Sequence, residues 1–436
     1  MQQSEFKKRR KQLLRHIGIG NIALLGSAQM QTRNRDVDFP FRQDSDFHYL
    51  TGFNEPDALA VFIPGREQGE YILFCREFDE KKALWEGAHA GLEGATKHYD
   101  ADHAFPIDDL DDILPGLLED KHRVFYPMGH DAELDHSLQN WIKHVRSLAR
   151  TGVAAPSELV CLDRALHEMR LFKSAAELKL MRRAAEISAE GHIKAMQTAA
   201  AGMYEYQVEA ELVYHFAKNG LRSVAYPSIV ATGKNACTLH YTDNNCKLKN
   251  GDLLLIDAGA ECDHYAADIT RTFPVSGKFS EPQKLLYQLV LDAQYAAIAE
   301  VKPGATWIAP HDAAVAVLTA GLVELGLLKG RVKQLIKKEK YKAFYMHRTG
   351  HWLGMDVHDV GDYKINGEWR LLAPGMVLTV EPGLYIPADC KAVEPKWRGI
   401  GIRIEDDVLV TAEGNEVLTA TVPKTVAEIE ALMQVQ

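Results

Sequence analysis

The sequence predicts two domains of mixed α and β structure, an α/β domain over residues 1–170 and a second domain over residues 171–436. The chain has 436 residues, which is more than one ordinary domain contains. Short apolar runs alternate with helical patterns over about the first 165 residues, as in an α/β domain. A helix start with the spacing of a capping box then follows at Ser174 and Glu177.

The first domain is expected to begin with an amphipathic helix and to continue through short strands and further helices. Gly, Pro and Asp turns separate its apolar runs. We expect strands at 21–26, 46–53, 59–64, 71–74 and 124–126, and helices at 4–17, 80–87, 109–118 and 131–148.

Two helices are expected at the start of the second domain. Apolar residues recur at helical spacing from Leu178 to Met196. A second helix around 206–218 ends at Asn219 and Gly220, which is a normal helix stop. The residues with candidate chemistry all follow these helices, so the function is expected to lie in the second domain.

The composition excludes several classes of protein. A net charge of −10 argues against nucleic-acid binding as the main activity. No run of about 18 apolar residues is present, so no membrane-spanning helix is expected. The basic N-terminus lacks an apolar signal-peptide core, and the six cysteines include no CxxC pair. We therefore expect a reduced, cytoplasmic protein that binds neither nucleic acid nor membrane.

Asp257 and Asp268 are expected to lie side by side. A buried apolar strand, Leu253–Ile256, ends at Asp257, and a second expected strand at 266–275 carries Asp268. Consecutive strands joined by a short loop tend to pair as a hairpin, which makes the two carboxylates neighbours. Because like charges repel, a merely structural role would require a cationic partner, and Arg271 is available for it.

Glu381 and Glu405 belong to two further strand-like stretches. Pro382 stops the first stretch and leaves Glu381 at its end. In the second stretch, strand alternation places Arg403 and Glu405 on the same face. Taken alone, that pair is most often a surface ion pair.

Three histidines, His347, His351 and His358, lie within twelve residues. Gly350 and Gly354 disfavour a regular helix here, and the HExxH signature of helix-borne zinc sites is absent. A single histidine would more often be a structural hydrogen-bonding residue, but three of them beside carboxylate-bearing strands favour a functional site.

The carboxylates and one imidazole together predict a metal centre. Four buried carboxylates cannot neutralise one another, and burying such charges without a partner is very costly. The set contains no thiolate, which favours hard or borderline ions such as Mn²⁺, Co²⁺ or Zn²⁺. Five ligands with bridging carboxylates suit two ions about 3.5–4 Å apart, and such a pair supports hydrolysis. The candidate ligands are Asp257, Asp268, His351, Glu381 and Glu405.

The order Asp, Asp, His, Glu, Glu resembles the dinuclear metallopeptidases of the pita-bread fold. The eleven-residue step from Asp257 to Asp268 fits, as do the contexts Gly-His351, Val-Glu381-Pro and Arg-x-Glu405. The resemblance covers nearly the whole chain and is strongest to the bacterial aminopeptidase P enzymes.

Other segments extend this resemblance. Residues 44–56 resemble the N-terminal domain of aminopeptidase P, and residues 226–230 and 239–241 resemble its substrate site. The resemblance implies an aminopeptidase P-type α/β domain over 1–170, followed by an α+β pita-bread catalytic domain over 171–436.

The resemblance also implies a role for each site residue. Asp257 would bind one ion, His351 and Glu381 the other, and Asp268 and Glu405 would bridge both. Glu381 would also accept the proton of the attacking water. The remaining residues would bind the substrate or stabilise the oxyanion: His240 and His358 at the carbonyl, His347, Tyr226, Tyr385 and Arg403 around it. Arg403 would also orient Glu405.

Trp85 aligns with a tryptophan that neighbouring subunits contribute to the active site in tetramers of the family, so a homo-oligomer, a dimer or a tetramer, is expected. The reaction implied is removal of the N-terminal residue from peptides with proline in second position. The cofactors implied are two divalent metal ions, with Mn²⁺ preferred and Co²⁺ or Zn²⁺ as alternatives. Alternatives are a prolidase restricted to Xaa-Pro dipeptides, a metal-free creatinase-like hydrolase and a non-catalytic protein-binding module. The last two predict lost ligands, and none is lost.

Overall fold

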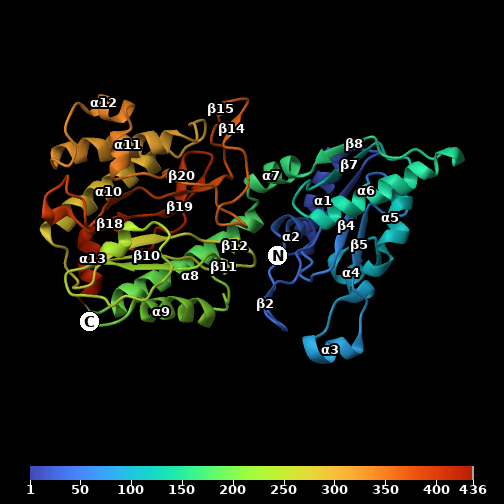
Figure 1. Cartoon of the computed structure of the whole chain (residues 1–436), viewed down its shortest axis with the longest axis horizontal. Coiled ribbons are helices and arrows are strands. Elements are labelled where there is room, and N and C mark those ends of the chain that lie inside the picture. Colours follow the sequence, from blue (N-terminus) through green and yellow to red (C-terminus); the bar gives the residue numbers. More distant parts are fainter. Residues whose placement is uncertain (435–436) are drawn as a thin grey trace. The chain divides into compact units, whose positions relative to one another are not determined.

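The computed structural model describes residues 1–434, and the chain divides into two compact units, Met1–Arg170 and Leu171–Gln436 (Figure 1). Each unit has a hydrophobic core of its own. None of the described helices combines the length and the apolar character needed to cross a membrane.

A six-stranded mixed sheet forms the centre of the first unit, in the order β6-β5-β4-β1-β7-β8. The central strands β1 and β4 pair antiparallel, and β1 and β7 pair parallel. Their apolar side chains are buried on both faces because helices cover the sheet. The strands are β1 (Ile22–Gly26), β4 (Leu59–Phe62), β5 (Tyr71–Cys75), β6 (His103–Pro106), β7 (Arg123–Tyr126) and β8 (Glu158–Cys161), with a small hairpin of β2 (Thr32–Asn34) and β3 (Val37–Asp38). The helices are α1 (Gln3–Ile17), α2 (Ser45–Thr51), α3 (Glu80–Glu86), α4 (Gly91–Tyr99), α5 (Leu110–Leu118), α6 (Ala132–Ser147) and α7 (Asp163–Leu171).

The expected strand at 46–53 is wrong, because this segment forms the helix α2. Asp44 accepts a hydrogen bond from the Phe47 amide at 2.8 Å and caps the start of the helix. Gly52 ends it in the left-handed conformation, at φ 66°. All seven residues of α2 are buried, so the segment has no polar face to reveal a helical period.

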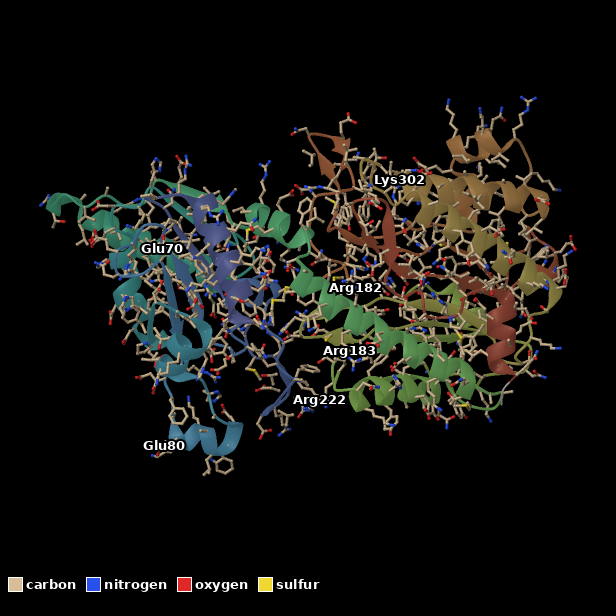
Figure 2. The ribbon with its side chains drawn as sticks, turned by 180° about the vertical axis from the view of Figure 1, so that it is seen from behind. Glu70, Glu80, Arg182, Arg183, Arg222 and Lys302 are labelled. Atoms are coloured by element: carbon tan, nitrogen blue, oxygen red, sulfur yellow. The ribbon has the colours of Figure 1, made fainter. Side chains whose placement is uncertain are left out.

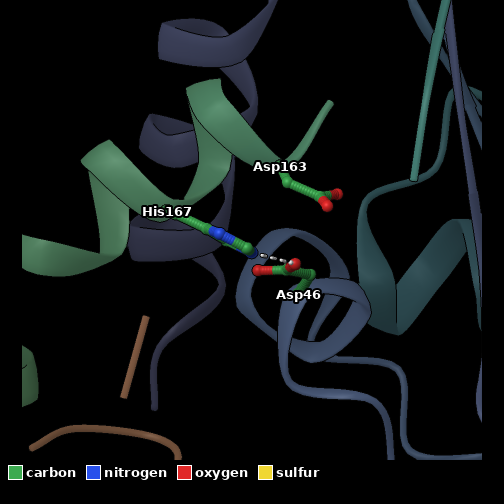
Figure 3. Close-up of side chains that lie close together, drawn as sticks. All are labelled: Asp46, Asp163 and His167. Atoms are coloured by element: carbon green, nitrogen blue, oxygen red, sulfur yellow. Dashed lines mark hydrogen bonds and ion pairs between the residues drawn. The ribbon is translucent and has the colours of Figure 1, made fainter. Parts of the chain in front are cut away.

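A buried charge cluster joins α2 to α7 (Figure 3). Asp46 accepts a hydrogen bond from Arg170 at 2.9 Å and lies 3.3 Å from His167 Nε2. Burial raises the pKa of Asp46, but the hydrogen bond and charge of His167 and the charge of Arg170 outweigh it and lower that pKa. Asp46, Asp163 and His167 offer metal-ligand atoms within 4.8 Å of one another, yet Asp46 is already neutralised by cations of the protein itself. We interpret the cluster as a structural ion pair.

The second unit holds its strands between two pairs of helices. In Figure 1, α8 and α9 lie on one side of the strands and α10 and α11 on the other. The helices are α8 (Ala175–Thr198), α9 (Glu205–Lys218), α10 (Glu281–Ala299), α11 (Ala309–Glu324), α12 (Val332–Lys337) and α13 (Val426–Met433). The strands are β9 (Ile229–Thr232), β10 (Leu253–Asp257), β11 (Glu261–Cys262), β12 (Tyr265–Ala266), β13 (Thr270–Pro274), β14 (Lys364–Ile365), β15 (Glu368–Trp369), β16 (Val377–Val380), β17 (Gly383–Ile386), β18 (Ile400–Arg403), β19 (Asp406–Val410) and β20 (Asn415–Val417).

Helix α8 begins at the predicted capping box, where Ser174 and Glu177 each bind the other's backbone amide. Its outer face carries Arg182 and Arg183 (Figure 2). Arg182 donates two hydrogen bonds to Glu416, at 2.9 and 2.7 Å, and so connects the helix to β20. The polar face of α8 is thus held at the surface while its apolar face packs on the core.

The Asp46 cluster predicts a stability difference within the first unit. Asp46→Asn removes the charge that neutralises Arg170, whose side chain is 3% exposed, and should lower the free energy of unfolding by at least about 2 kcal/mol. Because the pKa of Asp46 is lowered below its ordinary value of 3.8, the wild-type advantage should shrink as the pH falls through that lowered pKa. Urea denaturation of both proteins measures it.

Asp163→Asn is the matched control. Asp163 pairs with His130, whose side chain is 58% exposed, so its loss should cost less than about 1 kcal/mol. Equal destabilisation by the two substitutions would contradict the structural role assigned to Asp46.

Candidate metal centre and active site

One cavity of the second unit, of about 450 Å³, brings together all five candidate metal ligands. The five come from separate turns and strand ends between residues 257 and 405. The lining residues are Tyr226, Pro227, Ile229, Leu239, His240, Thr242, Asp257, Asp268, His347, Arg348, Gly350, His351, Val357, His358, Glu381, Arg403 and Glu405.

Asp257 is the last residue of β10, the central strand of the sheet β13-β10-β9. The chain directly after it is fixed by α8: His192 lies 2.9 Å from the Ala258 carbonyl oxygen. Burial lowers the pKa of His192 to about 4, so the neutral ring donates from Nε2. A side chain at Gly259 would place its Cβ 1.7 Å from the Ala267 carbonyl oxygen. Glycine is therefore required for the two segments to approach each other closely.

Asp268 does not lie inside a strand as expected, because β13 begins at Thr270. The antiparallel pairing itself is as expected and places Asp257 opposite Thr270. The Tyr226 hydroxyl lies between the two carboxylates, 2.6 Å from Asp257 and 2.5 Å from Asp268. The two carboxylates therefore face the same point, although they are not strand neighbours.

His351 lies in a non-helical segment that passes close to β16. A Cβ at Gly350 would meet the Thr379 carbonyl oxygen at 2.0 Å, so glycine allows this approach. His351 Nδ1 lies 2.9 Å from the Trp352 carbonyl oxygen and donates to it. Nε2 then faces the carboxylates, 3.4 Å from Asp268 and 3.7 Å from Glu381.

Glu381 follows the end of β16, and its amide donates to the Thr349 carbonyl oxygen at 2.7 Å. Glu405 lies between β18 and β19, not within one strand as alternation suggested. The Thr270 hydroxyl donates to Glu405 at 2.6 Å. Thr270 was not foreseen as a site residue, although its position two residues after Asp268 was the signal that could have identified it.

Arg403 is the buried cation of the site. It donates to Asp257 at 2.6 Å, to Tyr385 at 3.0 Å and to Thr270 at 3.1 Å. Arg403 makes no direct hydrogen bond to Glu405, and the link between the two side chains runs through the Thr270 hydroxyl. Arg271 is not a partner of the site carboxylates either, because its side chain is fully buried against Asp406 at 2.7 Å.

Four other predicted site residues differ in their relation to the cavity. Tyr385 is 1% exposed and does not line the cavity; it lies behind the wall, 2.9 Å from His347 Nε2. His240 and His358 line the cavity and are exposed. Trp85 lies on α3 in the first unit and is 88% exposed. Every residue that lines the cavity belongs to the second unit.

Repulsion and burial shift the pKa values of the site strongly. Burial, with the charges of Asp268 and Glu381, raises the pKa of Glu405 well above its usual range. Burial also raises the pKa of Glu381, to about 7. Burial lowers the pKa of His351, but the hydrogen bond to Asp268 and the charge of Glu381 outweigh it and raise that pKa to about 9. The cavity therefore favours cations.

The donor set fits a pair of hard or borderline metal ions. Four carboxylates and one imidazole converge, and no thiolate lines the cavity. Atoms of Asp268, His351 and Glu405 lie within 4.8 Å of one another. The Nδ1 hydrogen bond of His351 leaves Nε2 as the donor atom, as is usual for metal-binding histidines.

Comparison with known proteins agrees with this geometry. The metallopeptidase family M24 matches residues 179–412, and the N-terminal domain of aminopeptidase P matches residues 6–126. An Xaa-Pro aminopeptidase of Escherichia coli (strain K12) is 43% identical over 430 residues, which are 98% of this chain and 97% of that protein.

Solved structures are similar over the full length. Aminopeptidase PepP of Pseudomonas aeruginosa is 58% identical, with a TM-score of 0.99 over 100% of this chain and 98% of that one. Zinc-substituted aminopeptidase P of E. coli, in complex with product, is 42% identical, with a TM-score of 0.97 over 100% of this chain and 99% of that one.

The chain belongs to the metallopeptidase family M24, and it is a metal-dependent exopeptidase. The predicted order of an α/β domain and a pita-bread domain is confirmed. Within the family, the chain belongs with the Xaa-Pro aminopeptidases of the aminopeptidase P type.

The Thr270 bridge leads to a prediction about metal affinity. Thr270→Val keeps the shape of the side chain but removes the hydroxyl that connects Arg403 to Glu405. Loss of such a supporting hydrogen bond should weaken metal binding about 10- to 100-fold. Titration of metal-depleted protein measures this, and Thr270→Ser, which keeps the hydroxyl, is the control. Unchanged affinity in Thr270→Val would contradict the role of the bridge.

Proposed function

We propose that the chain removes the N-terminal residue from peptides with proline in second position, using two divalent ions held by the five converging side chains. The observation that carries the proposal is the single cavity that all five line, together with the full-length similarity to enzymes named Xaa-Pro aminopeptidase. Asp257 would hold one ion, His351 and Glu381 the other, and Asp268 and Glu405 would bridge both.

The ions, when bound, would polarise the substrate carbonyl and lower the pKa of the attacking water. Glu381 would accept the proton of that water and pass it to the leaving amine, since its carboxylate reaches the cavity from the end of β16. The exposed imidazoles of His240 and His358 would hold the carbonyl oxygen and stabilise the negative charge that develops on it.

A hydrogen-bonded chain fixes the tautomer of His347. Burial lowers the pKa of His347 to about 3, so the ring is neutral. Nδ1 donates to the Arg348 carbonyl oxygen at 2.7 Å, and Nε2 accepts from Tyr385. Arg403 in turn donates to the Tyr385 oxygen. We infer that this chain holds His347 as a rigid wall for the substrate, and that Tyr226 and Arg403 orient Asp257.

The wall of the cavity suits a proline ring. Proline has no amide proton to donate and its ring is apolar. Ile229, Leu239 and Val357 supply an apolar lining. Their side chains accept no hydrogen bond, so the missing amide proton of proline costs no interaction with them. A strict dipeptidase would also need a cation beside the proline carboxylate. Arg403 is already engaged by Asp257, Tyr385 and Thr270, and the other arginine that lines the cavity, Arg348, is exposed to solvent. The geometry therefore favours longer peptides over dipeptides.

Further parts of the proposal concern the metal, the assembly and the compartment. Mn²⁺ suits a carboxylate-rich ligand set, with Co²⁺ or Zn²⁺ as substitutes.

Helix α3 has no buried residue, and its Leu84 and Trp85 side chains are 85% and 88% exposed. This exposed apolar surface supports self-association as a dimer or tetramer, with Trp85 reaching a neighbouring subunit. The described cysteines form no disulfide, which supports a cytoplasmic location.

Substrate length tests the proposal. With Mn²⁺ present, Xaa-Pro-Xaa tripeptides and longer peptides should be cut with higher kcat/KM than Xaa-Pro dipeptides, because the engaged Arg403 cannot anchor a proline carboxylate. Peptides without proline in second position should be poor substrates. Steady-state kinetics on the three series measures this. A dipeptide preferred by tenfold or more would identify a prolidase instead.

A further inference from the structure

Arg348 is an exposed cation at the opening of the catalytic cavity. It and Arg403 are the two residues with a permanent positive charge among those that line the cavity. Arg403 is 4% exposed and bound to Asp257. The Arg348 guanidinium, in contrast, forms no ion pair or hydrogen bond within the described part of the chain, residues 1–434. Its closest ring contact is Trp369, at 5.9 Å from the ring centroid.

The backbone on both sides of Arg348 is held firmly to the active site. Its carbonyl oxygen accepts from His347 Nδ1 at 2.7 Å, and the next carbonyl, of Thr349, accepts from the Glu381 amide at 2.7 Å. The Thr349 side chain is buried between Tyr345 and His311. The base of the Arg348 side chain therefore has a fixed place relative to Glu381, while the guanidinium remains in solvent.

The surrounding charges leave the guanidinium available. Two acidic groups on neighbouring elements lie near the guanidinium: Asp312 on α11, and Glu339 in the segment that follows α12. Glu339 forms an ion pair with Lys342 at 2.8 Å. Neither acid forms an ion pair with Arg348. An exposed guanidinium presents a fork of donors that matches a carboxylate.

We propose that Arg348 is a specificity residue that binds a carboxylate of the substrate one residue beyond proline. This inference rests on the proposed function, because the direction of the peptide follows from it. With the first carbonyl at the metal ligands and proline against the apolar wall, the third residue points to the opening. An extended chain advances about 3.3 Å per residue, so a tripeptide carboxylate lies about 7 Å beyond the cleaved carbonyl, within reach of a long side chain at the rim.

The carboxylate can come from the C-terminus of a tripeptide or from an acidic side chain in third position. The first experiment compares Ala-Pro-Ala with its C-terminal amide. The second compares Ala-Pro-Glu-amide with Ala-Pro-Gln-amide. For each pair, kcat and KM are measured with the Mn²⁺-loaded full chain at low and at high salt.

The wild type should prefer the carboxylate-bearing member of at least one pair by about three- to fivefold, because an exposed ion pair contributes up to about 1 kcal/mol. The preference should appear in KM and decrease at high salt. Arg348→Ala should bring the ratio close to one, Arg348→Lys should retain part of it, and Arg348→Glu should reverse it. The peptide pair whose kcat/KM ratio changes in the Arg348 variants identifies which carboxylate is bound.

Lys364→Ala is the matched control. Lys364 lies over the same Trp369 ring, at 4.4 Å, but does not line the cavity, so its loss changes the net charge equally and should leave the ratio unchanged. A ratio unaffected by Arg348→Ala, or reduced equally by Lys364→Ala, would overturn the inference while the proposed function stands. Failure to cut any of the four peptides would overturn both.

Discussion

The buried guanidinium of Arg403 is the interaction on which the site depends. It lies 2.6 Å from Asp257 and donates also to Tyr385 and Thr270. Through Tyr385 it sets the tautomer of His347, and through the Thr270 hydroxyl it orients Glu405. One cation thus fixes parts of β13, β17 and β18 relative to one another. A lysine could not make three such contacts, because only the planar guanidinium presents its donors in that arrangement.

The single charge of Arg403 does not balance the four carboxylates of the site, and the fold must therefore hold like charges close together. Burial and mutual repulsion raise the pKa of Glu405 and of Glu381. The protein holds the carboxylates together nevertheless, since α8 fixes the chain after Asp257 through His192, and Gly259 and Gly350 allow backbone segments to approach within contact. Divalent ions bound by these side chains would relieve the repulsion, and the free energy cost of clustering like charges would then contribute to metal affinity.

Much of the architecture could be predicted from the sequence because its signals are local. The capping box at Ser174 and the short apolar strands identify helices and strands directly. The segment at 46–53 failed because α2 is buried on all sides and shows no helical period. The order of carboxylates and imidazole identified the residues that meet in one cavity.

The supporting contacts could not be predicted, because they depend on three-dimensional proximity. Thr270 lies between Arg403 and Glu405 across more than 130 residues of sequence. Neither arginine pairs with the carboxylate nearest to it in sequence: Arg271 binds Asp406, and Arg403 binds Asp257. No periodicity distinguishes these arrangements. In the sequence, Arg348 likewise resembles any other surface charge, and only the structure shows that it lines the cavity.

The measurement that tests the central claim most directly is the number of metal ions that the five side chains hold. Calorimetric titration of metal-depleted protein with Mn²⁺ should give two ions per chain. Asp268→Asn or Glu405→Gln, which removes a charge shared by both ions, should abolish tight binding of at least one. A single ion in the wild type, or two tightly bound ions in either variant, would contradict the account.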